Sequence, residues 1–320
     1  MDASPWFIFQ NTLSLMLQIA VIGGIGYIAF ARGMISESSL LVLSRLVIEI
    51  SFPCYAFTHI IKNLEIENLF SLIWLPIASI ALLGISYLIS LAYLKIDSKV
   101  QEKSEFALLA TFQNAVYIPI PIISSLFEGT AQSRMFMYLF IFNIPFSALM
   151  FTVATHVFRH SKGYPFSWRA LFSNPVIAVL VGLASVYTGI HTHIPLTIKS
   201  SMEMMGKITV PLVMFVIGST IYLNYQSKIR ACIKTILKVS AIKLIAVPVI
   251  VLAVIKLLPI SHEFAFLFLL EACMPAASTL SLIARKEEAD YKLVGAVILW
   301  SYLFSLITVP LFITLYFALR

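Results

Sequence analysis

Three polar side chains and two prolines stand inside one long apolar stretch, residues 112–126. They are Gln113, Asn114, Tyr117, Pro119 and Pro121. Proline removes a backbone donor and breaks or kinks a helix, so an interrupted helix is expected here. Where water is excluded, the freed backbone groups must bond within the protein or line a wet cavity. The stretch therefore predicts a binding site for a carboxylate or a cation. Alternatively, its amides satisfy helix carbonyls that the prolines free.

A carboxylate occupies a comparable place in a second apolar stretch, residues 263–284, which also contains Pro275. Glu271 lies about eight residues into this stretch, or roughly 12 Å at the standard helical rise. Ionisable groups at such a depth are rare and usually mark a path for ions or substrate. We predict that Glu271 carries a proton or binds Na⁺. The alternative is a structural carboxyl that bonds backbone groups near Pro275.

A lysine stands in a third apolar stretch, residues 233–257, where Lys243 lies about ten residues past the start. Its ammonium could neutralise an anionic substrate or pair with Glu271. Equally, its long stem could carry the charge toward the cytoplasm. Arg45 and Glu49 are four residues apart, so they share a helix face and are expected to form a structural pair.

The composition is that of an integral membrane protein. Of 320 residues, 60% are hydrophobic and 12% are charged, whereas soluble domains have roughly half apolar and a quarter charged residues. The sequence has no GxSxG, HExxH or Walker motif, which argues against an enzyme or an ATP-driven pump. Its three cysteines lie far apart, so neither a disulfide nor a metal site is predicted. No cofactor is expected beyond coupled H⁺ or Na⁺. The net charge of +7 is attributed to cytoplasmic loops rather than to nucleic-acid binding.

Ten stretches are long and apolar enough to cross a bilayer, which takes about 20 helical residues. They are residues 12–31, 40–61, 70–94, 104–126, 133–158, 174–190, 196–223, 233–257, 263–284 and 290–318. Basic residues gather in the loops after the first, third, fifth, seventh and ninth stretch. Since such loops stay in the cytoplasm, we predict a multi-pass protein of the cell membrane (inner or plasma) with both termini outside.

A single offset of 158 residues aligns the two halves of the chain in four regions. The pairs are IAVIGG (19–24) with IAVLVG (177–182), ISFPCYAF (50–57) with ITVPLVMF (208–215), EFALL (105–109) with EFAFL (263–267), and Phe146-Ser147 with Phe304-Ser305. Each half has an odd number of predicted helices, so the second half is inserted upside down. The predicted fold is all-α: inverted five-helix repeats at 1–158 and 174–320, a cytoplasmic linker at 159–173, and broken, crossing helices 4 and 9. Gln113 then falls opposite Glu271.

Several of these motifs resemble the auxin efflux carrier family. QNAVYIPIP, residues 113–121, is similar to its helix-4 motif, an Asn followed by Gly, an aromatic residue, Leu, Gly, Leu and Pro. Matches in kind are Asn114, Tyr117, Ile118, Ile120 and Pro121, whereas Val116 and Pro119 replace the two glycines. MPAASTLSLIA with RKEEAD, residues 274–290, resembles the proline and exit of its helix 9. NPVIAVLVGL at 174–183 and TVPLVMFVIGSTI at 209–221 resemble the starts of its helices 6 and 7.

The resemblance implies ten helices with external termini, a scaffold of helices 1, 2, 6 and 7, and a moving domain of helices 3–5 and 8–10. The short loop 159–173 is similar to that of bacterial members, which are permeases for small organic anions. Plant members export the auxin anion and carry Gln where Glu271 stands. Related sodium–bile acid symporters have a sodium-binding acidic residue nearby on helix 9, so the ion at Glu271 stays open between H⁺ and Na⁺.

Together these observations predict a secondary transporter of a small organic anion, working by alternating access of the elevator type. The predicted substrate-binding residues are Gln113, Asn114, Tyr117, Pro121, Lys243 and Pro275, with Glu271 coupling an ion. The expected partners are the anion, the lipid bilayer and a second copy of the chain in a homodimer, but no nucleic acid. The alternatives are a sodium-coupled symporter of the bile-acid type, a channel, and a membrane receptor that does not transport.

Overall fold

The computed structural model describes residues 4–63, 72–97, 100, 102–160, 174–225, 229–287 and 289–319. Within these residues every regular element is a helix, and the extended pairing is an isolated bridge between Gln113 and Ala276. The all-helical prediction is therefore confirmed for the described residues. All but the first two residues of the predicted linker, 159–173, lie outside the described part of the chain.

Seven helices in the described residues are long and apolar enough to cross a membrane. Three of them are single α-helices: α1 (Pro5–Ala31), α5 (Trp74–Ile96) and α17 (Tyr291–Leu319). The other four consist of consecutive segments: α2 (Glu37–Leu46), η1 (Val47–Ser51) and α3 (Phe52–Asn63); α8 (Gly129–Leu149), η3 (Met150–Ala154) and α9 (Thr155–His160); α11 (Leu196–Lys207) and α12 (Thr209–Tyr225); α13 (Ile229–Ala241), η6 (Ile242–Ala246) and α14 (Val247–Leu257). These seven helices match seven of the ten predicted spans.

The other three predicted spans are short or interrupted. The span predicted at 174–190 is α10 (Asn174–Tyr187), which has 14 residues, fewer than the about 20 of a full crossing. The span at 104–126 consists of α6 (Lys103–Thr111) and α7 (Pro119–Leu126). The span at 263–284 consists of α15 (His262–Ala272) and α16 (Thr279–Lys286). The arrangement as ten helices in two inverted repeats stays a prediction.

The sequence predicted that the two prolines of the fourth span interrupt a helix, but in the structure they lie after the interruption. The chain leaves the helix at Phe112, before either proline, and Pro119 is the first residue of α7. A proline is favoured there because its fixed φ suits a helix start and its missing N–H has no helical acceptor to bond. Pro121 lies in the same first turn, where the N–H groups of Ile120 and Ile122 bond the carbonyls of Val116 and Ile118 at 3.1 and 3.4 Å. These prolines therefore begin the second half-helix.

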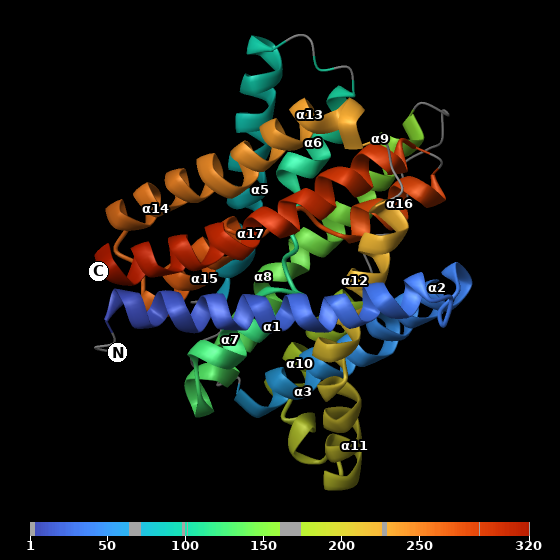
Figure 1. The fold of residues 1–320 in the computed structure, drawn as a ribbon. Coiled ribbons are helices and arrows are strands. Elements are labelled where there is room, and N and C mark those ends of the chain that lie inside the picture. The colour runs from blue at the N-terminus through green and yellow to red at the C-terminus, as the bar shows by residue number, and fades with distance from the viewer. Residues whose placement is uncertain are drawn as a thin grey trace.

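The long helices pack in two neighbouring groups (Figure 1). In that view α3, α10 and α11 pack together below α1, while α17 and the α13–α14 helix run above it. α5 packs on α6 and α8, and α1 contacts both α12 and α17. The two chain ends lie at the same side of the bundle.

Two glycines let α1 and α12 approach with their backbones nearly touching. A Cβ placed on Gly218 would lie 1.7 Å from the carbonyl oxygen of Gly23, and one on Gly26 would lie 2.1 Å from that of Phe215. Ser219 adds a hydrogen bond from its hydroxyl to the Gly26 carbonyl at 3.0 Å. Without water to drive helix association in lipid, such close contact between small residues is a main source of attraction.

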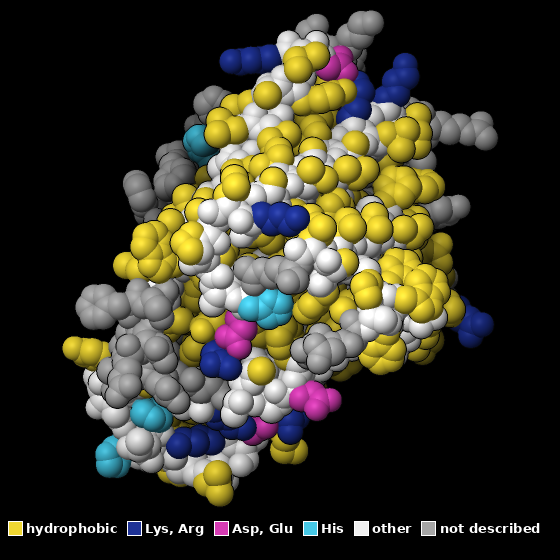
Figure 2. Space-filling model, turned by 90° about the vertical axis from the view of Figure 1, so that its left-hand side faces the viewer, with side chains coloured by type: hydrophobic (Ala, Val, Ile, Leu, Met, Phe, Trp, Pro, Cys, Tyr) yellow, Lys and Arg dark blue, Asp and Glu magenta, His cyan; other side chains and the backbone are white. Residues whose placement is uncertain are grey.

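The surface is mostly apolar, as a lipid-facing surface requires. Seen from the side of the chain ends, hydrophobic side chains cover much of the middle of the surface, while charged side chains gather toward the top and in the lower part (Figure 2). Ion pairs connect helices near their ends: Lys62 with Glu203 at 2.6 Å, and Arg134 with Glu263 at 3.0 Å.

Candidate functional site

The two helix breaks, residues 112–118 and 273–278, cross and bond each other. The N–H of Asn114 donates to the carbonyl of Pro275 at 2.7 Å, and the N–H of Ala277 donates to that of Phe112 at 3.0 Å. Gln113 stands opposite Ala276 between these two bonds. A local two-fold rotation exchanges the two bonds, so each break supplies one backbone N–H donor and one carbonyl acceptor to the other. Each broken helix thereby satisfies backbone groups that would otherwise be unpaired in an apolar interior.

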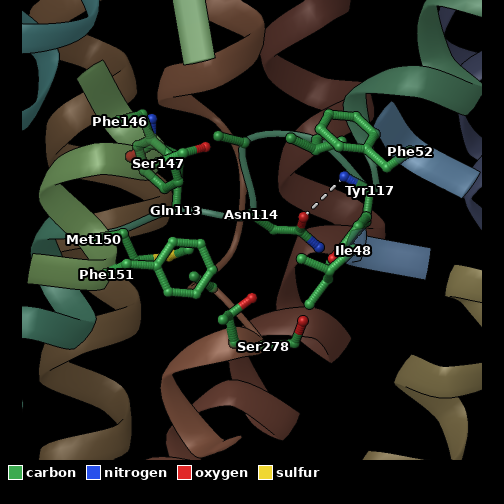
Figure 3. Close-up of a pocket in the computed structure, with 14 residues that line it drawn as sticks. Ile48, Phe52, Gln113, Asn114, Tyr117, Phe146, Ser147, Met150, Phe151 and Ser278 are labelled. Atoms are coloured by element: carbon green, nitrogen blue, oxygen red, sulfur yellow. Dashed lines mark hydrogen bonds between the residues drawn. The ribbon is translucent and has the colours of Figure 1, made fainter. Parts of the chain in front are cut away.

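Asn114 is held by two hydrogen bonds beside the crossing. Its Oδ1 accepts from the backbone N–H of Tyr117 at 3.0 Å, shown as the dashed line in Figure 3. Its Nδ2 donates to the hydroxyl of Tyr302 on α17. From α8, Asn143 donates to the carbonyl of Ala115 at 2.7 Å. The break is therefore fixed from two neighbouring helices.

A buried chain of three side chains lies at the crossing, joining Glu271, Gln113 and Lys243. Gln113 donates from Nε2 to Glu271 Oε2 at 3.4 Å, and Lys243 Nζ donates to Gln113 Oε1 at 3.2 Å. Lys243 also donates to the carbonyl of Thr111 at 3.0 Å. All three side chains belong to residues with no exposed surface. The amide of Gln113 therefore bridges the buried carboxyl group of Glu271 and the buried amino group of Lys243.

The position of the Lys243 ammonium excludes one interpretation from the sequence, in which its long stem carries the charge toward the cytoplasm. Its ammonium bonds α6 and the first break instead of reaching out toward the cytoplasm. In Glu271, Oε1 accepts no hydrogen bond from the described residues.

A small cavity of about 50 Å³ adjoins the crossing (Figure 3). Its polar lining comes from both breaks, from α8 and from the first residue of α16: Gln113, Asn114, Tyr117, Ser147, Ser278 and Thr279. Its apolar lining comes from η1, α3, α8, η3 and the two breaks: Ile48, Phe52, Phe146, Met150, Phe151, Ala115, Val116 and Ala277. In Figure 3 the α8 and η3 side chains face Ile48 and Phe52 across the cavity, with Ser278 at one end. We call this space the crossing cavity.

The structure separates the seven predicted site residues into two sets. Gln113, Asn114 and Tyr117 line the crossing cavity. The other four, Pro121, Lys243, Glu271 and Pro275, are not among its lining residues. Of these, Lys243 and Glu271 are connected to the cavity by their hydrogen bonds to Gln113. Pro275 contributes its carbonyl to the backbone pairing.

Three residues near the crossing were not predicted as site residues from the sequence: Ser147, Ser278 and Tyr302. Ser147 carries a signal in the sequence, since Phe146-Ser147 is one of the pairs aligned by the 158-residue offset. The sequence also did not predict the π-helical segments η1, η3 and η6. These segments supply Ile48, Met150 and Lys243 to this region. Such widened turns are frequent at functional sites, and an apolar sequence gives no local sign of them.

Comparisons with known proteins agree with one another. The family model described as a membrane transport protein matches residues 12–167 and 163–313. An uncharacterized transporter of Methanothermobacter thermautotrophicus is 25% identical over 310 residues, covering 95% of this chain and 98% of the relative. An uncharacterized transporter of Methanocaldococcus jannaschii is 23% identical over 309 residues, covering 93% and 97%. The chain therefore belongs to the membrane transport protein family, the auxin efflux carrier family that its helix-4 and helix-9 motifs resemble.

Proposed function

We propose that this protein is a secondary active transporter of a small organic anion such as a carboxylate. The observation that carries the proposal is the mutual pairing of two helix breaks beside a polar cavity, in a chain of a membrane transporter family. Interrupted helices that meet within the membrane form the substrate sites of many secondary transporters.

Anion recognition would come from hydrogen-bond donors at the crossing cavity. Asn114, Ser147 and Ser278 bring side-chain donors to it. The half-helix α16 begins at Thr279, which also lines the cavity. The positive end of the α16 helix dipole therefore lies at the cavity and would favour a carboxylate, although the N–H groups of Leu280 and Ser281 already bond the carbonyls of Ala277 and Ser278. Lys243 and Glu271 balance each other behind Gln113, so Lys243 would set the local field rather than contact the anion.

The size of the cavity supports a mechanism of alternating access. About 50 Å³ is far below the roughly 300 Å³ or more of a typical ligand pocket, so its walls must separate to admit a substrate. One wall is η1 and α3, in the predicted scaffold, and another is the crossing, in the predicted moving domain. A sliding movement of the elevator type between these two groups would open the cavity to either side.

Ion coupling is assigned to Glu271. Its Oε1 accepts no hydrogen bond from the described residues, so this oxygen is available to a proton or to Na⁺. Its Oε2 bonds Gln113, which lines the cavity. Binding of the ion at Glu271 would therefore change the substrate site through the side chain of Gln113.

The proposal is tested with purified protein in proteoliposomes. A thermal-shift screen of mono- and dicarboxylates, with and without Na⁺ at two pH values, selects an anion, and its radiolabelled form is then followed during uptake. We expect saturable uptake that Asn114→Ala lowers at least about tenfold, the effect of losing roughly 1.4 kcal/mol of binding. Asn11→Ala is the matched control, because Asn11 is exposed on α1. Normal uptake by both Asn114→Ala and Glu271→Gln would refute the assigned roles.

The same assay separates the alternatives. Uptake driven by a pH gradient and insensitive to Na⁺ excludes the bile-acid type of sodium symport. Uptake that does not saturate indicates a channel. Tight anion binding with no uptake under any gradient indicates a receptor, and would overturn the transport proposal.

A further inference from the structure

A second, larger cavity lies apart from the crossing cavity. It has a volume of about 660 Å³ and runs between α5, α6 and the helix built from α8, η3 and α9. Its walls are almost wholly apolar, with Leu83, Leu94, Ala107 and Leu108 buried along its floor. We call it the α5–α6 groove. Its proposed occupant does not depend on the transport mechanism above.

Each wall of the groove is a single helix face. α6 contributes residues 104, 107, 108 and 111, and the third wall contributes residues 149, 153 and 157. Steps of three and four residues return to the same side of an α-helix. On α5 the lining extends from Ile80 to Lys95, fifteen residues or about 22 Å. Half of a bilayer including its headgroup region is also about 20–22 Å, so the groove spans the depth of one leaflet.

The groove opens to the outside of the bundle. Ile80 and Tyr87, which line it, are large side chains on α5 with half of their surface exposed, at 53% and 47%. α5 is one of the seven helices able to cross a membrane, so this opening faces lipid. Lipid chains therefore have direct access to the groove from the bilayer.

One end of the groove is basic. Lys95 and Lys103 both line it and are exposed, and neither has an ion-pair partner among the described residues. Asp97, close to Lys95 in sequence, is bonded to Lys238 of α13. Glu105 is not among the lining residues, since it falls outside the α6 face that forms the wall. Two ammonium groups therefore lie at one end of the groove, where α5 ends and α6 begins, at the end predicted to face the cytoplasm.

We propose that the α5–α6 groove binds one anionic phospholipid. Its phosphate group bonds Lys95 and Lys103, and an acyl chain lies along the apolar walls. Basic sites between transmembrane helices on the cytoplasmic side favour anionic headgroups. The groove ends at Thr111 and Phe112, whose carbonyls hold Lys243 and Ala277 at the crossing. The lipid therefore stabilises the end of α6, where the polypeptide enters the first break.

Native mass spectrometry of the full chain in detergent tests the headgroup contact. The protein is equilibrated with equal amounts of phosphatidylglycerol and phosphatidylcholine. We expect one phosphatidylglycerol to be retained in preference to phosphatidylcholine. Lys95→Gln with Lys103→Gln should weaken this binding about fivefold for each lysine, or roughly 25-fold together. Lys256→Gln is the control, because Lys256 is exposed on α14 and does not line the groove. Equal retention of both lipids, or unchanged binding by the double variant, would overturn the proposal.

A second pair of variants tests the acyl-chain path. A Cβ on Gly84, which lines the groove, meets no atom within 4 Å. Gly84→Phe should fill the groove and abolish lipid retention, while Gly84→Ala should retain the lipid. Thermal unfolding of both variants without added lipid confirms that each is folded. Retention by Gly84→Phe equal to that of Gly84→Ala would refute the chain path. Displacement of the lipid by millimolar glycerol 3-phosphate would likewise refute it, since it would reduce the site to a headgroup contact.

Discussion

Gln113 and Glu271, which are hydrogen bonded through Nε2 and Oε2 at 3.4 Å, are 158 positions apart in the chain. The hydroxyls of Ser51 and Thr209 are also hydrogen bonded, and these residues have the same separation. This separation is the offset that aligns the two halves of the sequence. When a two-fold axis relates two halves, an equivalent pair touches only where it lies on the axis. An inverted repeat, which stays a prediction, would allow both contacts if they lie on its axis.

The backbone register at the crossing differs from that offset. Gln113 stands opposite Ala276, and 276 minus 113 is 163. Part of the difference arises before the break, because α15 has 11 residues where α6 has 9. The two halves therefore diverge at the candidate site, and the longer α15 keeps Glu271 within the helix, one residue before its end.

A double substitution tests the buried charges of Glu271 and Lys243. We expect Glu271→Gln and Lys243→Met each to lower the free energy of unfolding by about 3–5 kcal/mol, because each leaves an opposite charge buried without its partner. The double variant should be more stable than either single variant, since no buried charge remains. Thermal unfolding in detergent measures this coupling. Losses that simply add would show that the two charges do not interact through Gln113.

Removing one hydroxyl tests the orientation of Asn114. Tyr302→Phe takes away the acceptor of Asn114 Nδ2 and leaves that amide buried and unpaired. We expect anion uptake to fall about tenfold through a higher KM, from a penalty of roughly 1–3 kcal/mol for the unpaired donor. Tyr187→Phe is the control, as Tyr187 is 70% exposed. Equal uptake by the two variants would contradict a positioning role for Tyr302.

Two glycine substitutions of identical chemistry should have opposite effects. Gly218→Ala places a methyl group 1.7 Å from the Gly23 carbonyl, so α1 and α12 must move apart. We expect a loss of at least about 1–3 kcal/mol, the usual cost of overpacking. Gly24→Ala meets no atom within 4 Å and should be neutral or stabilising by up to about 1 kcal/mol, because alanine favours the helix. Melting temperatures in detergent compare them, and equal shifts would rule out close backbone contact.

The backbone pairing of the breaks is tested with proline. Ala277→Pro removes the N–H that bonds the Phe112 carbonyl, leaving a buried acceptor unpaired at a cost of about 1–3 kcal/mol. We expect uptake to be lost while the protein remains folded. Pro275→Ala keeps the carbonyl that accepts from Asn114, so its uptake should be largely preserved. The opposite ranking would mean that the proline ring, not the backbone pairing, supports transport.

The sequence by itself determined the apolar spans and the two stretches that contain the breaks. These are local properties: a crossing helix needs about 20 apolar residues, and prolines beside polar residues mark an interruption. The 158-residue offset also aligned Gln113 with Glu271 as equivalent positions, but their hydrogen bond became known only from the structure.

Only the tertiary structure decided which polar groups meet. An apolar helix carries no polar face that would show which side is buried, so neither the inward direction of Lys243 nor the place of Tyr302 beside Asn114 follows from the sequence. The same holds for the prolines at 119 and 121, which begin α7 because the break before them is satisfied by residues 275–277 from the other half of the chain. Pairing over such a distance depends on how the helices pack, which no local pattern encodes.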